Sequence, residues 1–147
     1  MWRKLVKMSN EEAYEFKFKK YASYDEKYSE FYKDLTKVTK SFFHGKNMTN
    51  IFIMAMALGF KKDAHPPLKK PSNSIPTEVF TKEEKWLMIS LYFQTNPKLG
   101  VSALWEPEQI LKNAEEYANG GIQYLKMLYD ESSEPLEALE EEFRKYL

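Results

Sequence analysis

Cysteine is missing from all 147 residues of this sequence. Its absence excludes disulfide bonds, a thiolate nucleophile and a cysteine-ligated zinc site. Long hydrophobic runs are missing too, since the longest, Ile51 to Leu58, is far too short to cross a bilayer. Residues 1–12 reach an asparagine and two glutamates before any apolar core develops, so no secretory signal is expected. We therefore expect a cytoplasmic protein that does not enter a membrane.

The chain also has no net charge, but its charges are unevenly distributed. Residues 1–100 contain 18 Lys and Arg against 11 Asp and Glu, whereas residues 101–147 contain 4 against 11. This asymmetry could mean a polyanion-binding face, a self-shielding tail or an oppositely charged neighbour. Neither half has a dense run of one sign, which favours an ordinary acidic helix surface. Length and the 43% hydrophobic content indicate a single domain over residues 1–147.

Hydrophobic periodicity indicates a mainly α fold, a compact bundle of about five helices around a buried central helix. The central helix is expected at residues 48–59, because this segment is apolar on every side and is followed by a stop at Gly59. The other helices are expected to start at capping-box sequences or first-turn prolines. These starts lie at Ser23, Thr81, Pro107 and Pro135.

Residues 14–20 alternate apolar and charged side chains, which favours a short N-terminal strand. Capping-box spacing at Ser9 allows a helix instead. The strand would need a partner, either residues 3–8 or the same segment of a second subunit. Residues 61–76 hold four of the seven prolines and little periodicity, so we expect an irregular surface loop there.

The pair Gly120-Gly121 lies inside a helical pattern, where each glycine costs about 1 kcal/mol relative to alanine. One interpretation is a helix that ends at Asn119-Gly120. The other is a continuous helix in which Gly121 admits a neighbouring backbone. The apolar stripe stays in phase across the pair, which favours close packing.

Few residues suggest catalysis or metal binding. His44 and His65 lie in separate loops and are expected to be surface residues. Glu83 and Lys85 match part of a nuclease signature, but they lie in a helix first turn where Glu84 completes a cap. Adjacent glutamates at Glu115-Glu116 project about 100° apart on a helix, so we expect a solvated polar face. We therefore assign no catalytic residue, cofactor or metal ligand.

A basic cluster offers the clearest candidate binding site. Lysines and a histidine crowd the proline-rich loop and could contact DNA phosphates non-specifically, although lysines also simply keep loops soluble. The candidate DNA-binding residues are Lys61, Lys62, His65, Lys69 and Lys70. The tyrosine-rich N-terminal part is better explained by core or subunit contacts than by base stacking.

Several segments, in this order, carry a family likeness: residues 31–35, 50–61, 67–68, 75–80 and 115–122. The sequence resembles the small Dnd-system-associated proteins, found in bacterial and archaeal loci linked to DNA phosphorothioate modification and restriction. The likeness covers residues 14–129 and leaves an acidic helical extension, 130–147, outside it. It implies a DNA-related or defence-related role and supports the N-terminal strand, but it brings no catalytic residue with it.

From these features we expect a non-enzymatic accessory or adaptor of DNA modification, restriction or mobile-element defence. It would bind DNA weakly through the basic loop or bind a larger partner protein. One alternative is a small metal-dependent nuclease or hydrolase with carboxylates gathered around Glu83. Another is a structural homodimer that pairs through the N-terminal aromatic segment.

Overall fold

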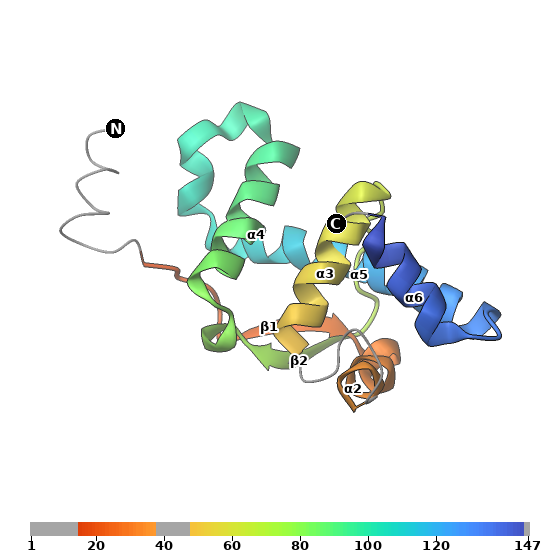
Figure 1. The fold of residues 1–147 in the computed structure, drawn as a ribbon. Helices are drawn as coiled ribbons and strands as arrows, with labels where there is room; N and C mark the ends of the chain where they lie inside the picture. Colours follow the sequence, from red (N-terminus) through yellow and green to blue (C-terminus); the bar gives the residue numbers. More distant parts are fainter. Residues whose placement is uncertain (1–14, 38–47, 146–147) are drawn as a thin grey trace.

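The computed structural model describes residues 15–37 and 48–145. The expected mainly helical fold is confirmed, and so is a small β element near the N-terminus (Figure 1). The loop expected at residues 41–46, His44 and the candidate strand partner at 3–8 lie outside the described residues. The elements are β1 (Tyr21–Asp25), η1 (Glu26–Tyr28), α2 (Ser29–Lys37), α3 (Met48–Lys61), β2 (Pro71–Pro76), η2 (Thr77–Val79), α4 (Lys82–Thr95), η3 (Pro97–Trp105), α5 (Pro107–Glu131) and α6 (Pro135–Arg144).

Helices α3 and α5 pack directly on each other at the centre of the molecule (Figure 1). A Cβ on Gly121 would overlap the Ala55 carbonyl oxygen, and a Cβ on Gly59 would overlap the Tyr117 carbonyl oxygen. Helix α5 runs unbroken through Gly121, so the close-packing interpretation is confirmed. The expected helix stop at Gly59 is wrong, because α3 continues to Lys61 and uses Gly59 for contact with α5.

The small sheet pairs β1 with β2 in antiparallel orientation, from Tyr21 opposite Pro76 to Asp25 opposite Pro71. The strand thus begins at Tyr21, and residues 15–19, where it was expected, have no regular secondary structure. Its partner comes from the segment that was expected to be irregular throughout. Prolines close both ends of β2, where a missing N–H is tolerated.

The expected helix start at Ser23 is also wrong. Ser23 lies inside β1, and the helical segment begins after Asp25, whose side chain accepts a hydrogen bond from the Lys27 N–H at 3.4 Å. Long-range partners explain the difference. The hydrogen bonds to β2 and to a carboxylate of α5 hold the Ser23 backbone extended. Ser23 therefore does not act as the helix N-cap that its local sequence indicates.

The later helix starts are confirmed. Thr81 and Glu84 form a capping box, with reciprocal hydrogen bonds of 3.1 and 2.8 Å. Pro107 and Pro135 begin α5 and α6. Helix α6 packs on α5 and buries Leu139, while α4 and η3 project together on the other side of the molecule (Figure 1).

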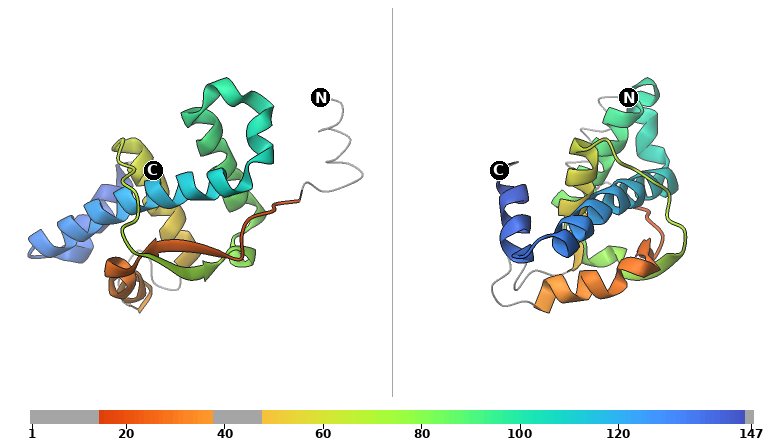
Figure 2. Two further views of the ribbon diagram at one scale, coloured as in Figure 1. Left: turned by 180° about the vertical axis from the view of Figure 1, so that it is seen from behind. Right: turned by 90° about the vertical axis from the view of Figure 1, so that its right-hand side faces the viewer.

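The connection from α3 to β2 crosses over α5 (Figure 2). The Gly120 position has no room for a side chain because the Ala64 carbonyl oxygen lies against it. The Asn119 side-chain amide donates hydrogen bonds to the carbonyls of Pro66 and Pro67, at 3.1 and 3.4 Å. Specific contacts therefore hold this part of the expected irregular loop, residues 64–67, against α5.

Candidate functional site

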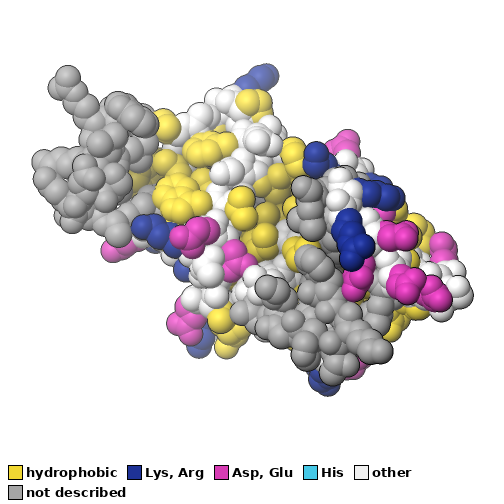
Figure 3. Space-filling model, viewed as in Figure 1, with side chains coloured by type: hydrophobic (Ala, Val, Ile, Leu, Met, Phe, Trp, Pro, Cys, Tyr) yellow, Lys and Arg dark blue, Asp and Glu magenta, His cyan; other side chains and the backbone are white. Residues whose placement is uncertain are grey.

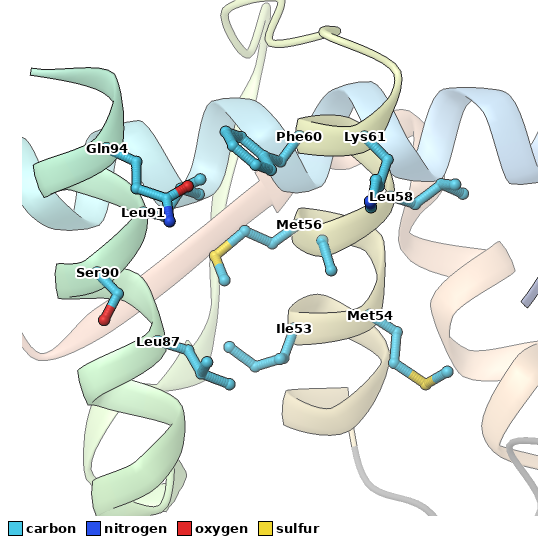
Figure 4. Close-up of a pocket in the computed structure, with 11 residues that line it drawn as sticks. Ile53, Met54, Met56, Leu58, Phe60, Lys61, Leu87, Ser90, Leu91 and Gln94 are labelled. Atoms are coloured by element: carbon cyan, nitrogen blue, oxygen red, sulfur yellow. The ribbon is translucent and has the colours of Figure 1, made fainter. Parts of the chain in front are cut away.

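An apolar groove lies between α3 and α4. Its volume is about 390 Å³, within the range of ligand and anchor-residue pockets. Hydrophobic side chains gather on this face of the molecule (Figure 3). Ile53 and Met56 point from α3 towards Leu87 of α4 (Figure 4). The lining residues are Ile53, Met54, Met56, Ala57, Leu58, Phe60, Lys61, Leu87, Ser90, Leu91 and Gln94.

The α3 wall of the groove follows from the composition of that helix. Its segment is apolar all round, and we expected all of its faces to be buried. The face that carries Ala55 and Gly59 meets α5. A second face remains accessible, with Ala57 exposed and Phe60 39% exposed. The expectation of a fully buried helix is therefore wrong for this face, which supplies one wall of the groove.

The α4 wall presents a stripe at helical spacing. Leu87 is 51% exposed, and Ser90 and Gln94 are also exposed. Met88 and Ile89, on other faces of the same helix, are buried in the core. The lining thus joins the apolar face of α3 to Leu87 and Leu91 of α4, with the polar Ser90 and Gln94 beside them, and a largely apolar surface of this kind is typical of a site that accepts another hydrophobic element. The sequence pattern predicted the helix but did not show that Leu87 would remain outside the core.

The basic loop begins at the end of α3. The Lys62 ammonium lies 3.4 Å from the buried Glu142 carboxylate of α6 and 4.4 Å from the centre of the Tyr124 ring. Desolvation acts to lower the pKa of Lys62, but Tyr124 and Glu142 together outweigh it and raise the pKa. Lys61 belongs instead to the lining of the apolar groove. The two lysines therefore face different neighbours.

The far end of the same loop contacts the β1–η1 corner. The Lys69 backbone N–H donates to the Asp25 carboxylate at 2.9 Å, and the Lys70 carbonyl accepts from the Glu26 N–H at 2.9 Å. Between the two ends, the His65 ring packs against Tyr117 with ring centres 4.8 Å apart. The five candidate DNA-binding residues are thus spread along the connection, with acidic residues of α6 and of the β1–η1 corner beside its two ends.

Glu115 is a buried carboxylate, so the expectation of a solvated polar face is wrong for this residue. It is 7% exposed and accepts a hydrogen bond from the Ser23 N–H at 2.6 Å. Burial raises the pKa of Glu115, although the Ser23 N–H and the Lys19 ammonium, 3.6 Å away, act in the opposite direction. Glu115 thus links α5 to β1 through a hydrogen bond. No pattern in the sequence around Glu115 predicts this contact.

Glu83 and Lys85 lie in the first turn of α4, as expected. The Lys85 ammonium lies 5.5 Å from the centre of the Phe16 ring. Within residues 15–37 and 48–145, no three histidine, aspartate or glutamate side chains come together as a candidate metal site. In the same part of the chain, no helix has both the length and the apolar character needed to cross a membrane.

Comparison with protein families matches residues 24–144 to the family described as DNA sulphur modification system-associated protein 4. The chain belongs to this family. The match includes the groove, the basic loop and α6, and so extends beyond the segments that suggested the resemblance. Neither a curated protein nor a solved structure matches this chain.

Proposed function

We propose that this protein is a non-enzymatic accessory of a DNA sulphur modification system and holds a protein component of that system in the α3–α4 groove. The observation that carries the proposal is the groove itself, with its apolar lining on two adjacent helices. Membership of a family described by its association with such a system supports a partner from the same system.

The shape of the groove favours a helix as the bound element. Two helices supply its walls, and the α4 side from Leu87 to Gln94 extends about 10 Å, close to two helical turns. An amphipathic helix places apolar residues at positions i, i+3, i+4 and i+7 along one face, which suits a groove of this kind. The expected partner segment is therefore an amphipathic helix with two or three large apolar anchors.

The features of the described surface favour binding to a protein over binding to DNA. The candidate DNA-binding lysines have carboxylates close by, such as Glu142 beside Lys62 and Asp25 beside the Lys69 backbone. Nearby acidic groups weaken the attraction of a surface for phosphates. DNA contact through Lys61, Lys62, His65, Lys69 and Lys70 stays a prediction, as does a homodimer through the N-terminal aromatic segment.

Affinity capture of the full chain from its native host tests the proposal, with the captured proteins identified by mass spectrometry. We expect a component of the DNA sulphur modification system, and we expect Leu87→Asp to reduce its capture more than tenfold. Burying a leucine contributes about 1.5–3 kcal/mol, and 1.4 kcal/mol corresponds to a tenfold change in affinity.

Met127→Asp is the matched control. Met127 on α5 is 46% exposed, close to the 51% of Leu87, and the substitution introduces the same charge outside the groove. Circular dichroism establishes that both variants are folded. The proposal is refuted if the two variants capture the same proteins equally well, or if no component of the modification system is among them.

A further inference from the structure

A second cavity lies beside α5, where the connection from α3 to β2 crosses that helix (Figure 2). Its volume is about 530 Å³, which is enough for one long side chain or a small molecule. The first half of α5, the crossing connection and the segment before β1 all contribute to its lining. The cavity shares no lining residue with the α3–α4 groove, so it is a separate site.

The Glu115 carboxylate lines this cavity, and the fold satisfies only one of its two oxygens. The Oε2 atom accepts from the Ser23 N–H at 2.6 Å, and the Lys19 ammonium lies 3.6 Å from the same atom. The Oε1 atom accepts no hydrogen bond from the residues that the structure describes. Glu115 is only 7% exposed, and burial raises its pKa in spite of these two partners. A buried carboxylate in this condition favours a further positively charged donor at Oε1.

The remaining charges of the cavity also favour a cation. Three glutamates line the cavity against two lysines, so its net charge is negative. These residues are Glu108, Glu115, Glu116, Lys19 and Lys112. An anionic ligand would bring a further negative charge close to the buried carboxylate, which is unfavourable. A ligand with one positive charge balances the lining.

The apolar part of the lining comes from Pro67, Leu68 and Pro71. A side chain with an alkyl stem and a charged head matches this combination, because the stem packs on apolar groups while the head reaches a carboxylate. A guanidinium suits a partly buried carboxylate better than an ammonium does. It is more weakly hydrated, and its planar set of five N–H donors can bond Glu115 while other donors face Glu116 or water.

We infer that this cavity binds an arginine side chain of a partner protein, whose guanidinium donates to Oε1 of Glu115. The family is described by its association with a modification system, which favours a protein as the source of the arginine. The inference goes beyond the proposed function, because it assigns a second contact that does not involve the α3–α4 groove.

Nuclear magnetic resonance titration of the full chain with N-acetyl-L-arginine amide tests this site. N-acetyl-L-citrulline amide is the matched control ligand, because it has nearly the same shape and no charge. We expect millimolar binding of the arginine amide and about tenfold weaker binding of the citrulline amide, since charge-assisted hydrogen bonds are the stronger ones. Backbone amide signals should shift at Leu68 and Glu116 and not at Ser90 in the groove. Equal affinity for the two ligands, or shifts centred on the groove, overturns the proposal.

A pair of glutamate variants tests the role of the buried carboxylate. Glu115→Gln removes the charge but keeps an oxygen that can accept from the Ser23 N–H, and it should weaken binding of the arginine amide about tenfold. Glu131→Gln is the matched control, because it removes the same charge from an exposed position of α5 outside the cavity. Equal losses in the two variants would show only general attraction and overturn the proposal. If circular dichroism shows that Glu115→Gln is unfolded, the comparison of the two ligands with the natural protein decides.

Free L-arginine distinguishes a protein source from a small-molecule source. It adds a terminal ammonium and a terminal carboxylate to the same side chain. Equal or tighter binding of the arginine amide supports a partner's arginine, whereas tighter binding of free arginine assigns the cavity to a small molecule and overturns the proposal. Leu87→Asp should leave the affinity for the arginine amide unchanged, so a failure of the proposed function and a failure of this site are observed separately.

Discussion

Replacing Gly121 by alanine tests the contact that places α3 on α5. In an exposed helix position this substitution stabilises a protein by about 1 kcal/mol, because alanine has the higher helix propensity. At Gly121 the new Cβ would overlap the Ala55 carbonyl oxygen. The obstacle is backbone, so it cannot turn aside as a flexible side chain would. The two helices must separate, and the apolar contacts around them loosen.

The magnitude follows from these two opposing effects. Overpacking a well-packed core costs about 1–3 kcal/mol, and a backbone obstacle places Gly121 at or above the upper end of that range. After the gain of about 1 kcal/mol from helix propensity, we expect a net loss of about 2 kcal/mol in the free energy of unfolding. Urea denaturation followed by circular dichroism measures this difference by linear extrapolation.

A pair of variants at Lys112 calibrates the propensity effect in the same helix. Lys112 is exposed on α5, so Lys112→Ala should be more stable than Lys112→Gly by about 1 kcal/mol. Gly121→Ala should instead lower the free energy of unfolding relative to the natural protein. If Gly121→Ala is as stable as the natural protein or more stable, α3 and α5 do not meet at this point, and the packing argument is wrong.

The remaining predictions concern separate contacts. Burial raises the pKa of Glu115, so the folded state binds the proton more tightly and stability should fall as the pH rises from about 4.5 through the folded pKa. Glu115→Gln should flatten this pH dependence in urea denaturation, and an unchanged profile would contradict it. Thr81→Ala should cost about 1 kcal/mol of stability through loss of the α4 cap, compared with Ser90→Ala as a control on the same helix. Lys69→Glu/Lys70→Glu should weaken any binding to duplex DNA at low salt, as measured by fluorescence anisotropy, and unchanged affinity would exclude these lysines as phosphate contacts.

The helix starts that were predicted correctly depend on local signals. Thr81 and Glu84 are three residues apart, and the reciprocal capping bonds need nothing from the rest of the fold. The first-turn prolines of α5 and α6 act through their own backbone geometry. The phase of the apolar stripe across Gly121 is also local, which is why the continuous α5 could be predicted.

Long-range pairing explains the errors. Residues 71–76 have neither apolar alternation nor high strand propensity, and they form β2 because β1 lies beside them. Glu115 is buried because its hydrogen-bond donor, the Ser23 N–H, comes from a strand 92 positions away in the chain. No pattern within one segment contains this information.

The candidate groove could be predicted only in part. The apolar character of α3 on all sides indicated burial, but it could not show that the face with Phe60 would be left open. Leu87 fits the periodicity of apolar residues in α4, so the sequence predicts a core residue. Only the positions of α3 and α4 in the structure show that it is exposed. The basic loop was visible in the sequence, whereas the Glu142 carboxylate beside Lys62 depends on how α6 packs.

The glycine contacts of α3 also have a consequence for the thermodynamics of binding. Gly59 of α3 lies in direct contact with the backbone of α5, and Gly121 of α5 lies in direct contact with the backbone of α3. Helix α3 therefore cannot move closer to α5 when a ligand occupies the groove face of α3. The groove wall that α3 supplies is thus already in place before a ligand arrives, and little binding energy is spent on reshaping it. Binding there should show a negative heat-capacity change set by the apolar area buried in the groove, without the larger change that accompanies refolding of a whole helix.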